Sequence, residues 1–256
     1  MSNIFFDKMV NSNDWFLNWF GSKYYHILYK NRSQNEANNF IRQLVQTLEL
    51  NPNENVLDLG CGKGRHSNTL SNLFKNLDGV DISPENISFA RKNKASNQQF
   101  YIADMRKFKM KKQYGYIFNL FTSFGYFKNE EDNIKVLENC NNHLKSKGML
   151  IIDFLNAKKV IPSINNKLEI KSINNVLFEL NKTIIDNCVI KNIKITDGKK
   201  TFKFKEKVQL FDLDRFKTMF DKTGFDLVSN YGDYDMRTYS KDSNRLILAV
   251  KKIKND

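Results

Sequence analysis

Short runs of consecutive apolar residues recur along the first two thirds of the chain, and segments of helical spacing separate them. The runs show no alternation of apolar and polar positions, which is typical of strands buried on both faces of a parallel sheet. Strand and helix signals that alternate in this way predict a doubly wound α/β fold. The predicted strands are 56–59, 79–82, 100–103, 116–121 and 149–154.

Apolar positions three and four residues apart predict helices between these strands. One helix is predicted over 65–74, directly after a glycine-rich turn. Ser83, followed by proline, marks the start of another, because serine caps helices and proline suits their first turn. Ile134 and Leu137 indicate a further helix, which Gly148 is predicted to end.

The pattern changes to strict alternation over residues 168–210, as in Thr201–Lys205. Asp197-Gly198 lies between two alternating runs, and this dipeptide is a strong signal for a two-residue hairpin turn. We therefore predict a small antiparallel sheet inserted over 157–210.

The α/β pattern resumes after the insertion. Asp212 is predicted to cap a helix that Gly224 ends, and two final strands follow at 227–231 and 246–251. These two strands extend the predicted sheet to seven. The aromatic-rich residues 1–32 are predicted to form short helices that pack onto another part of the chain.

Composition limits the class of protein. The 256 residues are 41% hydrophobic, so the chain is expected to fold, and no apolar run reaches the length of about 20 residues that spans a bilayer. The net charge of +13 could serve an anionic partner, but the positive residues are mostly scattered lysines. Three cysteines without a close pair, and an N-terminus without a secretory pattern, favour the cytoplasm.

The chemistry-bearing segment begins at the end of the first predicted strand. Gly60, Gly62 and Gly64 form a turn that lets the backbone approach a ligand closely. The dinucleotide fingerprint would need a glycine where Arg65 stands, so a nicotinamide cofactor is disfavoured. Asp81 ends the second strand, where a carboxylate can accept hydrogen bonds from both ribose hydroxyls.

Three acidic residues map to the carboxyl ends of successive strands: Asp58, Asp81 and Asp104. In an open parallel sheet the ligand crevice lies outside these ends. With the glycine turn beside them, they predict a site for a nucleoside-containing ligand.

The motifs Asp58–Gly62 with Gly64, Asp81–Ser83 and Ala103–Arg106 resemble those of the class I S-adenosylmethionine-dependent methyltransferases. The resemblance covers about 33–156 and 212–251. The run 119–126 is similar to the fourth motif of small-molecule members. It lacks the Asn/Asp-Pro-Pro-Tyr/Phe sequence of enzymes that methylate exocyclic amines of bases. The resemblance implies a Rossmann-like sheet and S-adenosylmethionine as the cofactor.

The resemblance also implies roles for single residues. The backbone of Gly60–Gly62 would follow the cofactor, Asp81 would bind the ribose, and Asp104 would accept from the adenine amino group. Leu120 and Phe121 would lie near the reacting methyl, and an N-terminal lid would close the site. The residues implied in cofactor binding are Tyr25, Arg32, Asp58, Gly60, Cys61, Gly62, Asp81, Ile82, Asp104, Met105, Leu120 and Phe121.

The candidates for proton transfer are His26 and Tyr126, and for each of them a purely structural role competes. The run Tyr231–Asp235, which precedes Arg245, either binds a polar substrate or is an ordinary loop between strands. No cluster of His, Cys and carboxylate residues has metal-ligand spacing, so no metal is expected.

The sequence thus predicts methyl transfer to a nitrogen or oxygen of a small molecule, by a monomer or homodimer. The chain is predicted to have three parts: lid helices (1–32), a cofactor-binding domain (33–156 and 211–256) and a substrate cap (157–210). The alternatives are an RNA or protein methyltransferase that uses the positive surface, or a cofactor-binding module without catalysis. The sequence motifs disfavour nucleic acid, and no membrane partner is expected.

Overall fold

The computed structural model describes residues 15–30 and 34–253. The chain divides into two compact units, each described here by itself. The sheet unit comprises Ser33–Val160 and Phe211–Asp256, and the hairpin unit comprises Met1–Arg32 and Ile161–Leu210. The predicted Arg32 and the first fourteen residues of the predicted lid lie outside the described residues.

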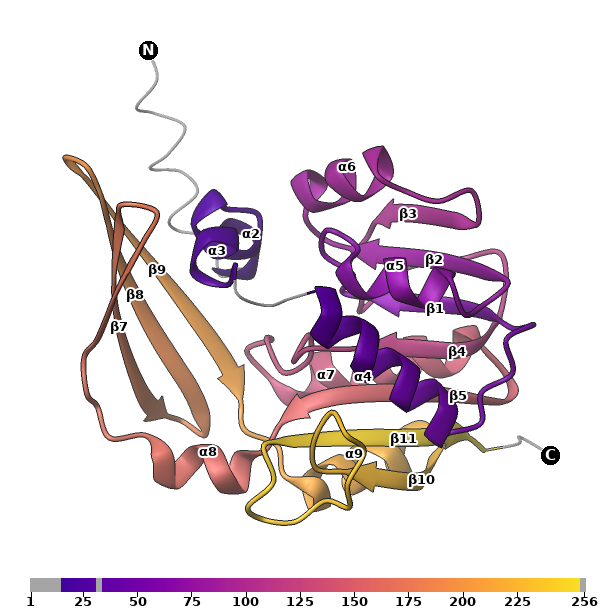
Figure 1. The fold of residues 1–256 in the computed structure, drawn as a ribbon. Helices are drawn as coiled ribbons and strands as arrows, with labels where there is room; N and C mark the ends of the chain where they lie inside the picture. The colour runs from indigo at the N-terminus through magenta and orange to yellow at the C-terminus, as the bar shows by residue number, and fades with distance from the viewer. Residues whose placement is uncertain (1–14, 31–33, 254–256) are drawn as a thin grey trace. The chain divides into compact units, whose positions relative to one another are not determined.

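The sheet unit contains a seven-stranded sheet in the order β10-β11-β5-β4-β1-β2-β3 (Figure 1). Neighbours are parallel except for β11, which runs antiparallel to both β5 and β10. This arrangement confirms the predicted α/β fold with a mostly parallel sheet. The strands are β1 (Asn55–Leu59), β2 (Asn76–Asp81), β3 (Gln98–Ile102), β4 (Tyr114–Asn119), β5 (Leu144–Leu155), β10 (Phe225–Tyr231) and β11 (Arg245–Lys252).

Helices cover both faces of this sheet (Figure 1). Helices α4 and α5 contact each other on one face, while α7 and α9 contact each other on the other. Ser83 and Asp212 cap their helices as predicted, because each side chain accepts a hydrogen bond from a backbone N–H of the first turn. The helices are α4 (Gln34–Thr47), α5 (Arg65–Ser71), α6 (Pro84–Lys92), α7 (Glu130–His143), α8 (Ala157–Ser163) and α9 (Leu213–Thr223).

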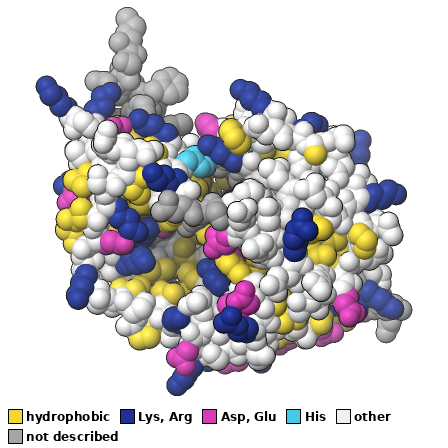
Figure 2. Space-filling model, viewed as in Figure 1, with side chains coloured by type: hydrophobic (Ala, Val, Ile, Leu, Met, Phe, Trp, Pro, Cys, Tyr) yellow, Lys and Arg dark blue, Asp and Glu magenta, His cyan; other side chains and the backbone are white. Residues whose placement is uncertain are grey.

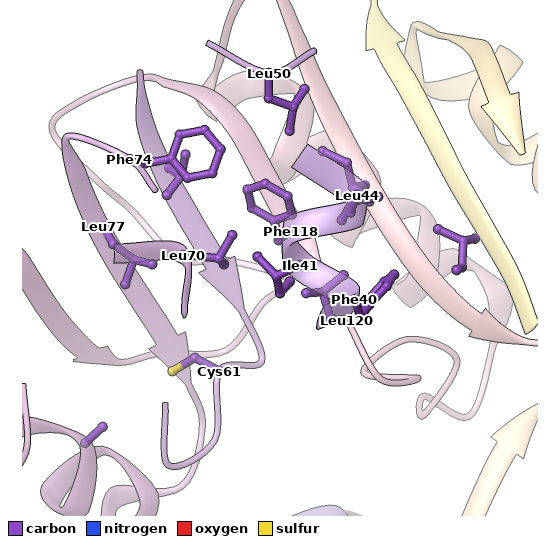
Figure 3. Packing of buried hydrophobic residues seen from close by; sticks show 14 of the residues in the cluster. Phe40, Ile41, Leu44, Leu50, Cys61, Leu70, Phe74, Leu77, Phe118 and Leu120 are labelled. Carbon is purple, nitrogen blue, oxygen red and sulfur yellow. The ribbon is translucent and has the colours of Figure 1, made fainter. Parts of the chain in front are cut away.

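The core of the sheet unit joins α4 to the central strands (Figure 3). Phe40, Ile41 and Leu44 of α4 are almost fully buried, and they belong to one cluster with Phe118 and Leu120. Burying each such side chain stabilises the fold by about 1.5–3 kcal/mol. This packing makes the residues that follow β4 part of the core.

Several predicted boundaries in the sheet unit were wrong. Helix α5, predicted over 65–74, ends at Ser71. Strand β4 ends at Asn119 rather than at 121, because Phe121 and Thr122 adopt left-handed backbone angles that no strand can continue. Helix α7 ends at His143, and Gly148 lies inside β5 instead of ending the helix. A Cβ at Gly148 would lie 3.0 Å from the carbonyl oxygen of Lys145, so this glycine serves a close backbone approach.

The hairpin unit contains the predicted antiparallel sheet, in the order β6-β7-β8-β9. Asp197 pairs with Lys200, so the β8–β9 turn is Gly198-Lys199, one residue later than predicted. Trp19 and Tyr24 are buried against the apolar face of this sheet. The elements are α2 (Trp15–Phe20), α3 (Lys23–Leu28), β6 (Glu169–Ile173), β7 (Val176–Ile185), β8 (Cys188–Asp197) and β9 (Lys200–Gln209).

Candidate active site

The carboxyl ends of the parallel strands carry the predicted polar residues. Strands β1 and β4 are neighbours in the sheet although β2 and β3 separate them in sequence. The strand order therefore reverses between β1 and β4, and ligands of open α/β sheets bind in the crevice at such a switch point. The glycine loop after β1 and the turn after β4 meet there.

The glycine loop adopts conformations that require glycine. The φ angles of Gly60, Gly62 and Gly64 are +80°, +56° and +85°. A Cβ at Gly60 would lie 2.8 Å from the Cβ of Ser123, whereas a Cβ at Gly62 would meet no atom within 4 Å. The loop thus packs tightly against the turn after β4 at Gly60 and is open at Gly62.

Asp58 lies behind this loop and is buried. The Ser67 hydroxyl donates a hydrogen bond to its Oδ2 over 2.5 Å. Burial raises the pKa of Asp58 from 3.8 to about 7, because the charged carboxylate loses its hydration there. A cationic group bound nearby would therefore stabilise the ionised form of Asp58.

Asp81 connects the end of β2 to the glycine loop. Its Oδ2 accepts from the backbone N–H of Gly62 over 2.9 Å, and its Oδ1 accepts from that of Ser83 over 2.8 Å. Burial raises its pKa, although these N–H groups stabilise the charged form. Each oxygen retains capacity to accept from a ligand hydroxyl. Ile82 follows and is half-buried.

Asp104 is engaged by a partner that the sequence reasoning missed. The Arg106 guanidinium contacts both of its oxygens, the shortest distance being 2.6 Å from Nη2 to Oδ2. Burial alone would raise the pKa of Asp104, but Arg106 holds it below its ordinary value. Arg106 also donates to Asp132 over 2.9 Å. Asp104 is therefore oriented by Arg106, and Met105 lies between them in sequence.

The turn after β4 is held by a buried carboxylate on the next strand. The backbone N–H of Phe121 donates to Oδ2 of Asp153 over 2.9 Å, and that of Thr122 donates to the Asp153 carbonyl over 2.8 Å. Arg245 Nε contacts Oδ1 of Asp153 at 2.7 Å. The Phe121 ring faces the guanidinium of Arg65 at 4.9 Å and that of Arg245 at 5.9 Å.

Asn119 begins this turn and is buried. Its Nδ2 donates to the carbonyl oxygens of Leu59 and Ser123, over 3.0 and 3.4 Å. Its Oδ1 has no hydrogen-bond partner among the residues that the structure describes. A hydrogen-bond donor of a bound ligand would satisfy this oxygen.

The sequence reasoning had left open whether the run Tyr231–Asp235 binds substrate. In the structure the Tyr234 hydroxyl donates to Oδ2 of Asp153 over 3.1 Å, and its ring packs on Phe40 at 4.3 Å. Tyr234 therefore supports the turn after β4 from within the sheet unit. Its pairing with Asp153, 81 residues away, left no signal in the sequence pattern.

The remaining candidates lie in different units. Tyr126 is half-buried in the sheet unit, after the turn that follows β4. Tyr25 and His26 lie on α3 of the hairpin unit. The Tyr25 ring contacts the ring of Trp19 at 5.6 Å and that of His26 at 5.3 Å.

The described residues also bear on metal binding and on membrane insertion. Within residues 15–30 and 34–253, no group of three or more His, Cys, Asp and Glu residues could hold a metal ion. Over the same ranges, no helix combines the length and apolarity needed to cross a membrane.

The site fits S-adenosylmethionine by its own chemistry. The open face at Gly62 leaves room for a ligand against the backbone. The carboxylate of Asp81 retains acceptor capacity for hydroxyl groups, and the buried carboxyl group of Asp58 would be stabilised in its charged form by a cationic group. A nucleoside linked to an ammonium-bearing chain matches this order of donors and acceptors.

Comparisons with known proteins agree with this geometry. A family model described as a methyltransferase domain matches residues 50–224, more than half of the chain. Over 98 residues the chain is 26% identical to the dTDP-3-amino-3,4,6-trideoxy-alpha-D-glucopyranose N,N-dimethyltransferase of Streptomyces venezuelae. That match covers 38% of this chain and 41% of the relative, so the chain spans about two fifths of that protein's length.

Solved structures extend the similarity to most of the chain. A S-adenosylmethionine-dependent methyltransferase from Clostridium acetobutylicum superposes with a TM-score of 0.79 at 21% identity, covering 93% of this chain and 99% of that one. CalS10, an amino pentose methyltransferase from Micromonospora echinaspora solved with S-adenosylmethionine bound, gives 0.70 at 15% identity, with coverages of 90% and 97%. The chain therefore belongs to the S-adenosylmethionine-dependent methyltransferases of the Rossmann-like class I type.

Proposed function

We propose that this methyltransferase acts on a nitrogen or oxygen atom of a small-molecule acceptor. The observation that carries the proposal is that the chain adds a separate antiparallel unit, inserted after β5, to a sheet unit with a polar cofactor edge. Specificity usually resides in segments added to a common fold. The named relatives that methylate an amino sugar nucleotide and an amino pentose support an acceptor of this class.

The cofactor would supply an electrophilic methyl group on a sulfonium sulfur; the acceptor lone pair would bond to the methyl carbon as the carbon–sulfur bond breaks, with S-adenosylhomocysteine as the leaving group. In our proposal the backbone of Gly60–Gly62 binds the amino-acid end of the cofactor, and Asp58 meets its ammonium group through water. Asp81 accepts from the ribose hydroxyls. Leu120 and Phe121 form the wall beside the methyl group, and positioning supplies much of the rate acceleration.

The adenine ring is assigned to the ends of β2 and β3. Ile82 and Met105 would contact its faces, and Asp104 would accept from its amino group. Arg106 already contacts both oxygens of Asp104, so the amino group would use the acceptor capacity that these oxygens retain. This assignment makes Arg106 a residue that orients the adenine pocket.

Further parts of the chain are assigned to the acceptor. We propose residues 1–32 as a lid, with Tyr25 and Arg32 closing over the cofactor, and 157–210 as a substrate cap. His26 and Tyr126 are the proposed groups for proton removal or substrate orientation. Such a base is needed only where the acceptor arrives protonated.

A polyanionic acceptor finds less support. The net charge is +13, but on the face shown in Figure 2 the Lys and Arg side chains are spread among uncharged ones and form no continuous patch. Nucleic-acid binding surfaces concentrate basic residues on one face. The face in view therefore offers a polyanion no continuous basic surface.

Transfer of a labelled methyl group tests the proposal. The protein is incubated with methyl-labelled S-adenosylmethionine and, in parallel, with a metabolite extract, with amino sugar nucleotides and with bulk tRNA. Label is expected in a low-mass product. Label confined to tRNA or to protein, with none in the metabolite fraction, would contradict the small-molecule assignment. The Asp81→Ala variant serves as the control for cofactor dependence.

A further inference from the structure

Two bulky residues in succession hold a backbone conformation that side chains disfavour. The φ angles of Phe121 and Thr122 are both +60°. Left-handed backbone angles at non-glycine residues are strained, most of all for β-branched and bulky side chains such as these, and they persist only where surrounding contacts enforce them. The contacts that enforce them here come from β5 and β11.

Asp153 binds both residues of this turn. Its carboxylate accepts from the N–H of Phe121, and its carbonyl oxygen accepts from the N–H of Thr122. The side chain is 0% exposed, so no water competes for these hydrogen bonds. One residue therefore fixes two consecutive peptide groups.

Arg245 completes the clamp from β11. Its Nε contacts Oδ1 of Asp153 at 2.7 Å, and its Nη2 donates to Oγ1 of Thr122 over 2.9 Å. The antiparallel register places Arg245 opposite Leu155 and Ile247 opposite Asp153, which brings the guanidinium to the carboxyl end of β5. Arg245 thus touches both the residue that holds the turn and the turn itself.

We propose that Asp153 and Arg245 are positioning residues for methyl transfer. They hold Phe121 and Thr122 in the left-handed turn and so set the wall against which the methyl group meets the acceptor. This inference rests on the proposed placement of Phe121 beside the methyl group. Both residues contact the turn itself, so in this proposal each acts through the shape of the turn.

The test uses the full-length protein and S-adenosyl-methionine carrying a ¹³C-labelled methyl group. The methyl chemical shift in the bound state reports the orientation of that group toward the Phe121 ring, without any need for an acceptor. In Asp153→Asn, an amide nitrogen replaces one of the two oxygens, so the side chain can no longer accept from both the Phe121 N–H and Arg245. We expect the bound methyl resonance to move, while cofactor affinity stays within about threefold because the residues proposed to bind the cofactor are unchanged.

A matched control exists on β2. Asp78 is 1% exposed and accepts from the Tyr114 hydroxyl over 2.6 Å, with Lys112 Nζ at 2.7 Å. Asp78→Asn therefore disturbs a buried aspartate with the same kinds of partner, a tyrosine and a cation. We expect its bound methyl resonance to coincide with that of the wild type. A resonance unmoved in Asp153→Asn, or moved equally in Asp78→Asn, would overturn the proposal.

Two further variants keep the test decisive. If Asp153→Asn does not fold, Thr122→Val removes only the acceptor of Arg245 Nη2 and should move the resonance in the same sense by less. An unmoved resonance then overturns the proposal. Phe121→Leu removes the aromatic ring. If the bound methyl chemical shift is unchanged in Phe121→Leu, the proposed placement of Phe121 is wrong, and the inference is overturned with it. A resonance that responds to Phe121→Leu but not to Asp153→Asn overturns the inference alone.

Once a methyl acceptor is identified, steady-state kinetics of methyl transfer give a second readout. A misplaced wall should lower kcat of Asp153→Asn by about 10–100-fold, as small errors of position do in bimolecular transfer. The KM for the cofactor should stay near that of the wild type. A loss confined to cofactor KM would point to a purely structural effect and contradict the positioning role.

Discussion

The two units place left-handed backbone at different kinds of residue. Among the described residues of the hairpin unit, every positive φ angle falls on Asn, Asp or Gly, as at the β6–β7 turn of Asn174-Asn175. These residues tolerate the conformation at low cost, and they suit hairpin turns. The sheet unit instead places Phe121 and Thr122 in this region, directly after β4. Strain is therefore stored beside the candidate site, and the hairpin unit is built without it.

The carboxylates of the two units differ in the same sense. Lys23 and Tyr24 lower the pKa of Asp197 in the hairpin unit by donating hydrogen bonds to it. Burial raises the pKa values of Asp58 and Asp81 in the sheet unit. The charge of Asp197 is thus satisfied within the hairpin unit, whereas the charges of Asp58 and Asp81 are left to be satisfied by a ligand. Perturbed carboxylates of the second kind are typical of functional sites.

The largest expected effect tests whether the two units are energetically separate. Phe178 is fully buried in the core of the hairpin unit, and Phe178→Ala should destabilise that unit by about 3–5 kcal/mol. Amide hydrogen exchange should show lost protection in β6–β9 and unchanged protection in β1–β5. Phe118→Ala, at an equally buried position of the sheet unit, should give the reverse pattern. Equal loss in both units after either substitution would show one cooperative structure instead.

The charge comparison predicts that stability depends on pH through Asp58 but not through Asp197 between pH 5 and 8. The folded protein raises the pKa of Asp58 from 3.8 to about 7, so the stability contributed by its protonated form is lost as pH rises through 7. Asp58→Asn mimics the protonated carboxyl group at every pH. It should raise the free energy of unfolding of the cofactor-free protein at pH 8 by on the order of 2–4 kcal/mol, and by less at pH 5.

Asp197→Asn provides the matched control in denaturant melts at pH 5, 6, 7 and 8. The lowered pKa of Asp197 means that its contribution is present above its unfolded pKa and disappears only as pH falls below that range. Its difference from wild type should therefore be constant from pH 5 to 8. A gain for Asp58→Asn that does not grow with pH would show that the Asp58 carboxyl group is solvated in solution.

Loss of the Asp81 carboxylate should weaken the cofactor site next. Asp81→Ala leaves two ribose hydroxyls without their proposed acceptor and removes the hydrogen bond to the N–H of Gly62. Affinity for S-adenosylmethionine should fall by about 1–3 kcal/mol. Calorimetry on the folded variant measures this, with Asp78→Asn as a buried aspartate outside the site. Equal affinities of Asp81→Ala and wild type would remove Asp81 from the site.

Sequence reasoning found the features that depend on local order. The glycine loop, Asp81 and the capped helices follow from residues within one strand–turn–helix segment, where spacing and turn chemistry determine the geometry. The clamp on Phe121 does not, because Asp153 and Arg245 meet only through the antiparallel register of β5 and β11, 92 residues apart. Register of this kind comes from sheet assembly rather than from any local pattern.

Gly148 and Asp104 show the same limit. Glycine after a helical segment usually ends the helix, but Gly148 instead lies in β5, where backbone atoms crowd its Cα. Asp104 was predicted from its place after β3, whereas its capture by Arg106 depends on side-chain conformations within a loop. The position of a residue along a strand was therefore predictable, but the partner that its side chain contacts was not.

The smallest expected effect measures backbone strain in the two units directly. Lys147 is exposed in the sheet unit with a φ of +62°, and Asn175 is exposed in the hairpin unit with a φ of +60°. Glycine adopts this conformation without penalty, so Lys147→Gly should stabilise the protein by about 0.5–1 kcal/mol. Asn175→Gly should change stability by only a few tenths of a kcal/mol, because asparagine already tolerates the left-handed region. The free energies of unfolding from denaturant melts of constant slope distinguish the two variants. Equal gains would mean that the left-handed conformation costs no more in the sheet unit than in the hairpin unit. Strain at Phe121 and Thr122 would then need no clamp.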